Sequence, residues 1–305
     1  MTLRLVYRLY GGENMKGRPP FYSKTASLAS FLQAAEIANG AVSMLADGPI
    51  PDDLRSMMAG RGPVIDLPGG PIGMRDSFIA GLRYPTDQGW PDDDVVYFCE
   101  DDYLHDPQAF VALSAAASAI PSAGYFALYA STPVHPAMGP NVPFEPPADW
   151  VEHPSIVVAG QRWVNVPSTA STFGARVGVL KTDFSIFRQG MIPYPSRYLD
   201  HEICMVYQGR LPYTAKEIVL GPPSTRFRTG VNEFAANAFL SPFRLAFQLR
   251  ALTRRRRPHL LYAADPNLAC HLETEFMAPG VDWTEHARSA EAWATQAGFP
   301  VDTPS

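Results

Sequence analysis

The stretch DVVYFCEDDYLHDP, residues 94–107, indicates the fold more clearly than any other part of the chain. Its apolar run, residues 95–99, ends abruptly at three carboxylates, Glu100, Asp101 and Asp102. A short apolar run bounded by polar residues is typical of a strand buried on both faces of a parallel sheet. Three like charges at its end repel one another and lose hydration when buried. The acids therefore either extend into water or surround something positive.

The chain before this stretch alternates strand-like and helix-like segments. Strands are predicted at residues 3–9, 41–47, 62–70 and 94–102, and helices at residues 27–38, 51–60, 74–84 and 106–120. This alternation with short connections indicates an α/β protein whose parallel sheet is covered by helices on both faces. In such sheets ligands bind beyond the carboxyl ends of the strands. Asp47, the pair Gly69–Gly70 and the acidic triplet Glu100–Asp102 should therefore share one edge.

The second half of the chain is less regular. Strand patterns occur at residues 123–132, 154–167 and 168–180, and helices are predicted at residues 198–210 and 241–257. A proline-rich connection covers residues 133–154, and residues 221–258 as a whole are hard to place. Long irregular connections are therefore expected in this half.

Composition narrows the class of protein. The 305 residues are 46% hydrophobic, which is enough for a sizeable core in one large domain or two small ones. The formal net charge of -5 argues against a nucleic-acid ligand. Three scattered cysteines are too few for a disulfide framework and fit a reducing, cytoplasmic setting. No window approaches the roughly 20 apolar residues that a membrane-spanning helix needs.

An α/β half whose fourth strand ends in acids resembles the GT-A-fold glycosyltransferases, particularly the family-2-like members. In that family the acidic triplet, called the DXD motif, holds a divalent metal that grips the diphosphate of a nucleotide sugar. The resemblance runs from Arg4 to Trp283 and leaves residues 221–258 as an insertion. It implies a Rossmann-type, mixed, mostly parallel sheet flanked by helices. Residues 1–132 would form a nucleotide-sugar-binding half, and residues 133–305 a less regular, acceptor-binding half of the same domain.

Further stretches carry the same resemblance in the first half and at the acceptor side. Asp47 stands where the family has the acid that meets the base or ribose of the nucleotide. GGPIGMRDSFIAGLRY (residues 69–84) resembles G-x-x-x-A-R-N-x-G, with Gly73 and Arg75 at matching positions. STASTFGARVGVL (residues 168–180) is similar to the strand that borders the acceptor.

Two later stretches complete the resemblance. LDHEI resembles E-D-x-E-L, which places Asp200 on the second acid and Glu202 on the later one, whereas Leu199 replaces the first acid. PNLACHLETEFMAPGVDW (residues 266–283) resembles the closing segment P-S-L-x-T-H. It puts His271 where the family completes its metal site.

The resemblance implies Mn²⁺ or Mg²⁺ as cofactor. A divalent cation supplies positive charge where the leaving diphosphate gains negative charge. Oxygen ligands suit either ion, and an added imidazole favours Mn²⁺. We expect Asp102 and His271 to bind the metal, while Glu100 is a second ligand or a ribose contact and Asp101 points away or orders the turn. The alternative is a solvated turn leading to a helix capped by Asp106, with a structural His271.

Asp200 is the candidate general base. An inverting transfer needs a carboxylate that takes the proton of the attacking acceptor hydroxyl. His201 is the alternative base, and Glu202 is expected to hydrogen-bond the acceptor. Asp200 could instead only cap the following helix, a position that Asp favours.

Basic residues near the same edge are candidates for binding the phosphates. The loop of residues 11–24 follows the first strand and should overhang the nucleotide pocket. A helix start near the glycine-rich turn would add backbone N–H groups. The candidate side chains are Arg8, Lys16, Arg18, Lys24 and Arg75, with ordinary solvated surface positions as the alternative.

These observations predict a metal-dependent, inverting glycosyltransferase of the hexosyltransferase class, with a UDP-sugar donor as the family default and an unidentified acceptor hydroxyl. A metal-dependent nucleotidyl- or phosphoryl-transfer enzyme and a catalytically inactive GT-A-like binding domain stay open as alternatives. The run Arg254–Arg257 could contact anionic lipid at the periphery of a membrane, an anionic acceptor or nucleic acid, or be the solvated end of a helix. A homo-oligomer is compatible with the sequence.

Overall fold

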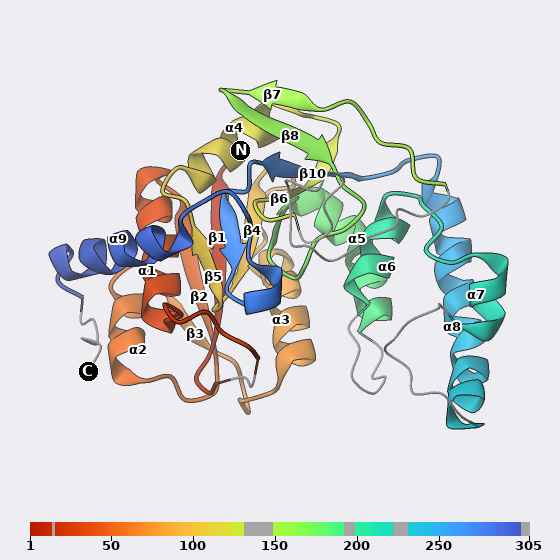
Figure 1. Ribbon diagram of the computed structural model, residues 1–305, viewed down its shortest axis with the longest axis horizontal. Coiled ribbons are helices and arrows are strands. Elements are labelled where there is room, and N and C mark those ends of the chain that lie inside the picture. Colours follow the sequence, from red (N-terminus) through yellow and green to blue (C-terminus); the bar gives the residue numbers. More distant parts are fainter. Residues whose placement is uncertain (14–15, 131–148, 192–198, 222–230, 300–305) are drawn as a thin grey trace.

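The computed structural model describes residues 1–13, 16–130, 149–191, 199–221 and 231–299. Within these residues the chain forms a nine-stranded sheet in the order β3-β2-β1-β4-β9-β6-β10-β8-β7 (Figure 1). Its strands are β1 (Leu3–Tyr10), β2 (Ala41–Asp47), β3 (Val64–Asp66), β4 (Val95–Glu100), β6 (Ala123–Ala127), β7 (Ile156–Val158), β8 (Gln161–Asn165), β9 (Phe173–Arg176) and β10 (Leu260–Asp265).

The strand directions confirm the predicted mixed, mostly parallel sheet. β1 pairs in parallel with β2 and β4, β2 pairs in parallel with β3, and β6 does so with β10. β9 runs antiparallel between β4 and β6, and β8 runs antiparallel to both β10 and β7. Only β8 and β9 are therefore reversed among the strands of this sheet.

Helices cover both faces of the sheet, as the sequence pattern predicts. The helices are α1 (Lys24–Ile37), α2 (Asp52–Ala59), α3 (Met74–Asp87), α4 (Ala109–Ala119), α5 (Val177–Gly190), α6 (Asp200–Tyr207), α7 (Ala215–Leu220), α8 (Val231–Arg254) and α9 (Trp283–Gln296). α1, α2, α4 and α9 belong to the layer on one face, and α3, α5, α6 and α8 to the layer on the other. Figure 1 shows α7 and α8 at the edge of the molecule farthest from α9.

Strand β4 explains why the apolar run is continuous. Val95, Tyr97 and Cys99 belong to the core on one face of the sheet, whereas Val96 and Phe98 belong to the core on the other face. Successive side chains of a strand point to opposite faces, so a central strand needs apolar residues at every position. Burial on both sides therefore fixes β4 at the centre and brings the acidic triplet to its carboxyl end.

A small second sheet joins two distant parts of the chain. β5 (Tyr103–His105) pairs antiparallel with β11 (Ala269–His271), with Tyr103 opposite His271. β5 begins directly after the acidic triplet, so this pairing carries the closing segment of the chain to the end of β4. The register therefore places His271 beside Asp102.

Several elements differ from the predictions. The strand predicted over residues 168–180 ends at Arg176, and the chain continues as α5. β10 and α9 were not predicted at all. Most of the expected insertion at residues 221–258 is the single helix α8, which contacts α6 and α7. Asp106 does not cap α4 from the N-cap position, which Gln108 occupies, although its carboxylate accepts the backbone N–H of Gln108 at 2.7 Å.

Two sequence expectations fall on parts of the chain that the structure does not describe. The proposed boundary between residues 132 and 133 lies outside the described residues, as does the part of the insertion at residues 222–230. Among the described residues, no helix is both long enough and apolar enough to cross a membrane.

Candidate active site

A cleft of about 640 Å³ opens at the carboxyl ends of β1, β2 and β4. It is lined by Arg8, Tyr10, Gly12, Lys16, Tyr22, Lys24, Asp47, Met74, Glu100, Asp101, Asp102, Tyr103, Ala170, Ser171, Asp200 and His271. Seven separate parts of the sequence therefore meet in one cavity. This is the position that the sheet topology predicts for a ligand.

Glu100 is held by two neighbours. Arg8 of β1 forms an ion pair with Oε1 of Glu100 and also donates to the hydroxyl of Ser77 at 2.8 Å. Ser171 donates to Oε2 of the same carboxylate at 2.5 Å. Both oxygens of Glu100 are therefore engaged within the protein, although Glu100 and Arg8 both line the cleft.

Asp101 ties the acidic triplet to the start of α1. Its Oδ2 lies 3.1 Å from Nζ of Lys24 and accepts the backbone N–H of Tyr10 at 3.1 Å. Burial and the charge of Asp102 raise the pKa of Asp101, and the neighbouring ammonium of Lys24 only partly offsets them. The carboxylate therefore links the end of β1 to the start of α1, and it is one of the residues that line the cleft.

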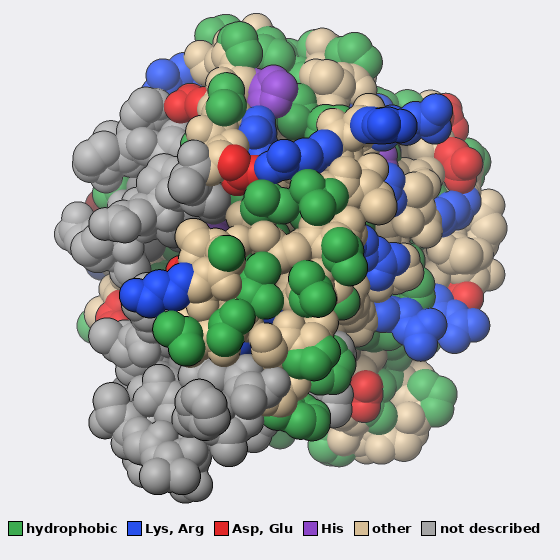
Figure 2. All heavy atoms as spheres, turned by 90° about the vertical axis from the view of Figure 1, so that its right-hand side faces the viewer, with side chains coloured by type: hydrophobic (Ala, Val, Ile, Leu, Met, Phe, Trp, Pro, Cys, Tyr) green, Lys and Arg blue, Asp and Glu red, His purple; other side chains and the backbone are tan. Residues whose placement is uncertain are grey.

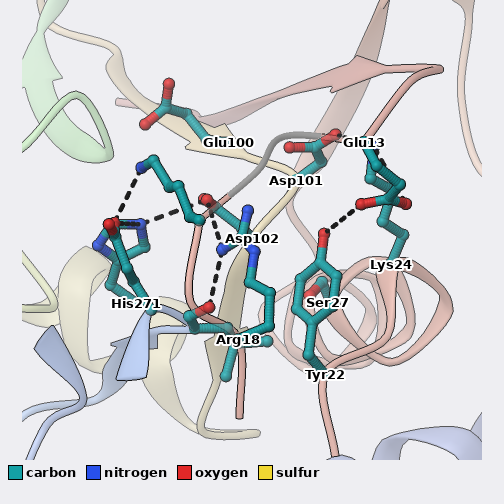
Figure 3. A network of polar contacts seen from close by, with 12 residues as sticks. Glu13, Arg18, Tyr22, Lys24, Ser27, Glu100, Asp101, Asp102 and His271 are labelled. Carbon is teal, nitrogen blue, oxygen red and sulfur yellow. Dashed lines mark hydrogen bonds and ion pairs between the residues drawn. The ribbon is translucent and has the colours of Figure 1, made fainter. Parts of the chain in front are cut away.

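Asp102 lies between two basic side chains and is only 4% exposed. Its Oδ2 accepts a hydrogen bond from Nη1 of Arg18 at 3.0 Å and lies 3.3 Å from Nε2 of His271 (Figure 3). Burial by itself raises the pKa of Asp102, but the hydrogen bond from His271 and the charges of His271, Lys16 and Arg18 hold it below the usual range. The carboxylate is therefore ionised at neutral pH.

His271 is fixed by contacts on two sides. Its ring stacks on Tyr103, with the centroids 4.7 Å apart and the planes inclined by 5°. Its Nε2 also lies 3.5 Å from Oε2 of Glu273, which Lys16 contacts at 2.9 Å. The imidazole therefore presents Nε2 to two carboxylates at the cleft.

Asp102 and His271 are two side chains of the kinds that bind divalent cations. Oδ1 of Asp102 is buried and has no hydrogen-bond partner among the residues that the structure describes. Carboxylate oxygens and one imidazole are ligands that Mn²⁺ accepts. Within the described ranges, no group of three or more His, Cys, Asp or Glu side chains is arranged so that it could hold a metal ion. Arg18 and Lys16 contact Asp102 and Glu273 instead.

The two acids on α6 face different surroundings. Asp200 is the first residue of the helix and lines the cleft, and its Oδ1 accepts the backbone N–H of His201 at 2.8 Å. Leu199 occupies the N-cap position, so Asp200 is not the capping residue. Glu202 is 2% exposed and accepts a hydrogen bond from the hydroxyl of Tyr213 at 3.0 Å. Glu202 is therefore directed into the core, not placed among the lining residues as expected for an acceptor contact.

Of the residues predicted to meet the nucleotide, Asp47 lies in the cleft, whereas those at the start of α3 do not line it. Asp47 ends β2 and lines the cleft, and its Oδ1 accepts the backbone N–H of Ile72 at 2.7 Å. Gly73 precedes α3 with φ 86°, a left-handed conformation that favours glycine. Met74, and neither Gly73 nor Arg75, is among the lining residues.

The cleft also contains aromatic and hydroxyl side chains that the sequence patterns did not single out. Tyr10, Tyr22, Tyr103 and Ser171 line it. The guanidinium of Arg18 lies 4.4 Å from the ring centroid of Tyr22. Tyr10 directly precedes the loop of residues 11–24, which was expected at this pocket, and Tyr22 lies within it, but nothing in their spacing marked them.

Comparisons with known proteins leave the function open. No protein-family model matches the sequence, and no curated protein matches it. Among solved structures, residues 1–349 of TarS from S. aureus are similar with a TM-score of 0.40 and 14% identity, over 67% of this chain and 54% of that one. A 4-diphosphocytidyl-2C-methyl-D-erythritol synthase is similar with a TM-score of 0.36 and 10% identity, over 66% of this chain and 83% of that one. This chain thus matches about half the length of the TarS fragment.

Proposed function

We propose that this protein is a metal-dependent glycosyltransferase that moves a sugar from a nucleoside-diphosphate donor to an acceptor hydroxyl. The observation that carries the proposal is that one cleft collects Asp47, Asp102, Asp200 and His271. These side chains stand at the positions that the resemblance to the GT-A-fold glycosyltransferases assigns to the nucleotide, the metal and the acceptor. By the same resemblance the donor is a UDP-sugar, the transfer inverts the anomeric centre, and the enzyme is a hexosyltransferase.

Charge in the cleft supports a requirement for a metal ion. Five carboxylates line it, against three Lys or Arg side chains, which leaves a net charge of about -2 at neutral pH. Arg18 and Glu273, which adjoin the lining, cancel each other. A nucleoside diphosphate is itself an anion and would be repelled by this field. A divalent cation reverses that balance at the place where the diphosphate must bind.

Asp102 and His271 would hold the cation, which supplies positive charge to the leaving diphosphate when it is bound. Oε2 of Glu273 faces the same Nε2 of His271, so this carboxylate would lie beside the cation. Arg18 and Lys16 contact Asp102 and Glu273 in this structure. Once released from these carboxylates, the side chains of Arg18 and Lys16 would be available to the phosphates of the donor.

The acceptor side of the reaction would depend on Asp200. Its position at the first turn of α6 leaves one carboxylate at the cleft surface, with Ala170 and Ser171 also in the lining. A carboxylate so placed can accept the proton of an attacking hydroxyl. Asp47 on the other side would meet the base or ribose of the donor.

Nucleotidyl transfer is the second candidate, and the basic loop of residues 11–24 favours it. Lys16 and Lys24 of this loop line the cleft, and Arg18 contacts Asp102. A nucleoside triphosphate carries more negative charge than a diphosphate and would use several cations near its phosphates. This reaction would release pyrophosphate, whereas glycosyl transfer releases a nucleoside diphosphate.

A thermal-shift screen tests the proposal most economically. The panel comprises UDP-, GDP-, CMP- and dTDP-sugars and the four nucleoside triphosphates, each with and without Mn²⁺. At 100 times its Kd a ligand stabilises the native state by about 2.7 kcal/mol. We expect stabilisation by one class of nucleotide sugar, only with the metal. A flat response would contradict the proposal, and a triphosphate response with pyrophosphate release would favour nucleotidyl transfer.

A further inference from the structure

Helix α8 has one face that is firmly packed against the protein. Arg244, Phe247, Gln248 and Ala251 follow the i, i+3, i+4, i+7 pattern and are all less than 9% exposed. Gln248 accepts the backbone N–H of Tyr213 at 3.2 Å and donates to its carbonyl at 2.6 Å. These contacts fix the orientation of the helix, and therefore also the face that it turns outward.

The outward face is also apolar, although nothing in the described chain covers it. Leu245, Leu249 and Leu252, spaced i, i+4, i+7, form a leucine stripe on one side of α8. About half of each side chain is exposed: 47%, 55% and 47%. Phe239 of α8 is 66% exposed, and Val219 and Leu220 of the adjoining α7 are also exposed. We call this surface the α7–α8 face.

The space-filling view agrees with these exposures. Figure 2 looks onto the side of the molecule that carries α7 and α8 in Figure 1. Hydrophobic side chains gather near its centre, Lys and Arg side chains border them, and few Asp or Glu side chains lie among them. Contiguous exposed apolar surface with a polar border is typical of an interaction site.

The charge of this segment is opposite to that of the whole protein. Residues 234–264 contain six arginines and neither Asp nor Glu, in a chain of net charge -5. Arg254 pairs with the buried Asp183, so this residue is not the solvated helix end expected from sequence. Arg256 and Arg257 are exposed and have no ion pair with any described residue. They lie directly after the leucine stripe.

We propose that the α7–α8 face docks on an anionic membrane surface. A helix that exposes an apolar stripe beside arginines can lie in the plane of the interface, with leucines among the acyl chains and arginines at the headgroups. Each Lys or Arg near an anionic surface contributes about 1 kcal/mol. A second copy of the chain would bring the arginines of two such faces together, and a nucleic acid would leave the leucines exposed. The anionic bilayer satisfies both features.

Flotation with lipid vesicles tests the proposal with the full-length protein. Vesicles of phosphatidylcholine alone are compared with vesicles containing 30% phosphatidylglycerol. We expect at least about tenfold tighter binding to the anionic vesicles, since two unpaired arginines contribute about 2 kcal/mol. Equal binding to both vesicles, or no binding to either, would overturn the proposal.

Substitutions separate the two components of the face. Leu245→Gln, Leu249→Gln and Leu252→Gln combined should reduce binding at least tenfold, as should Arg256→Gln with Arg257→Gln. Matched controls are Ile37→Gln with Val111→Gln on α1 and α4, and Arg83→Gln with Arg288→Gln on α3 and α9. These exposed side chains lie on other helices, so binding should stay within twofold. A stripe variant that binds like the wild type would contradict the assignment.

A probe within the face gives a result that does not depend on affinity. The three native cysteines are buried, so Leu249→Cys offers one exposed thiol for an environment-sensitive fluorophore. Its emission should shift to the blue on anionic vesicles, whereas the same label at Val111→Cys should not respond. A concentration-dependent dimer that the leucine substitutions abolish would instead assign the face to a second copy and refute the membrane proposal.

Discussion

Nε2 of His271 lies 3.3 Å from Oδ2 of Asp102, although 169 residues separate them in the chain. The pairing of β5 with β11, with Tyr103 opposite His271, produces this contact. The closing segment of the chain is thereby placed at the end of the central strand β4. Any chemistry in the cleft that uses both side chains depends on this pairing.

Asp200 and Glu202 should respond differently to loss of charge. Asp200→Asn is expected to keep donor binding and to lose at least about 100-fold in kcat, the usual range for a general base. Glu202→Gln should lower the free energy of unfolding but leave kcat within a few-fold, because its carboxylate bonds to Tyr213 in the core. Steady-state kinetics and urea unfolding of both variants make the comparison. Normal transfer by Asp200→Asn would show that Asp200 is not the base.

Arg18 should compete with a metal ion for Asp102. Unit charges about 4 Å apart interact by about 4 kcal/mol at an effective dielectric constant of about 20. Because the arginine side chain is flexible and can move away from a bound cation, only part of this repulsion would weaken metal binding. Arg18→Gln is therefore expected to tighten Mn²⁺ binding at least tenfold in the absence of nucleotide. Calorimetric titration with Mn²⁺ measures it, with Arg55→Gln as the control on an exposed pair with Asp66. Unchanged affinity in Arg18→Gln would contradict competition.

His105 should make the fold sensitive to mild acid. Burial lowers its pKa to about 3, against about 6.5 in the unfolded chain. Between these values the unfolded chain binds a proton that the native protein does not, so stability falls as the pH drops below about 6.5. The loss from this group is about 2 kcal/mol between pH 7 and pH 5. The groups that face it, Tyr97 and Cys99, stay neutral there because burial raises the pKa of both.

His105→Gln tests this origin. Urea unfolding at pH 7 and pH 5 gives, for each protein, the loss of unfolding free energy between these two pH values. This loss should be smaller in His105→Gln by most of the roughly 2 kcal/mol that linkage assigns to His105. Other titrating groups act equally on both proteins and cancel. The same pH slope in both proteins would rule out His105 as the source.

A buried ion cluster should matter more for stability than a surface pair on the same helix. Asp183 is fully buried and contacts Arg254, His259 at 2.5 Å and the hydroxyl of Tyr125 at 3.0 Å. Asp183→Ala is expected to lower the free energy of unfolding by about 3–5 kcal/mol, because it leaves Arg254 partly buried without its partner. Asp92→Ala, which breaks the exposed pair with Lys181, should cost at most about 1 kcal/mol. Equal losses of unfolding free energy in the two variants would show that the buried cluster contributes no more to stability than the surface pair.

The first half of the fold could be predicted because its signals are local. The apolar run of β4 and the alternation of strands and helices specify a buried parallel sheet, whose topology brings Asp47 and the acidic triplet to one edge. β10 and α9 were missed. Where the local sequence pattern is short or ambiguous, tertiary contacts determine whether a segment becomes a helix or a strand. α5 begins with Val177, so its first turn looked like the continuation of a strand.

The site shows the same division between local and long-range information. Asp200 at the start of a helix was predictable from its neighbours. Glu202 was not expected in the core, yet residues two apart on a helix differ by about 200° around its axis and cannot face one cleft together. The partner of each acid is long-range information: Arg8, Arg18 and Lys24 were recognised as basic residues near the pocket, but not as partners of Glu100, Asp102 and Asp101.

The central claim is that Asp102 binds a divalent cation that in turn binds the donor diphosphate. Calorimetric titration of UDP into the wild type and Asp102→Asn, each with and without Mn²⁺, tests it directly, with folding checked by circular dichroism and GDP as the alternative nucleotide. We predict that Mn²⁺ tightens nucleotide binding to the wild type at least 100-fold, about 2.7 kcal/mol, and has little effect on Asp102→Asn. The same Mn²⁺ dependence in both proteins would contradict the claim.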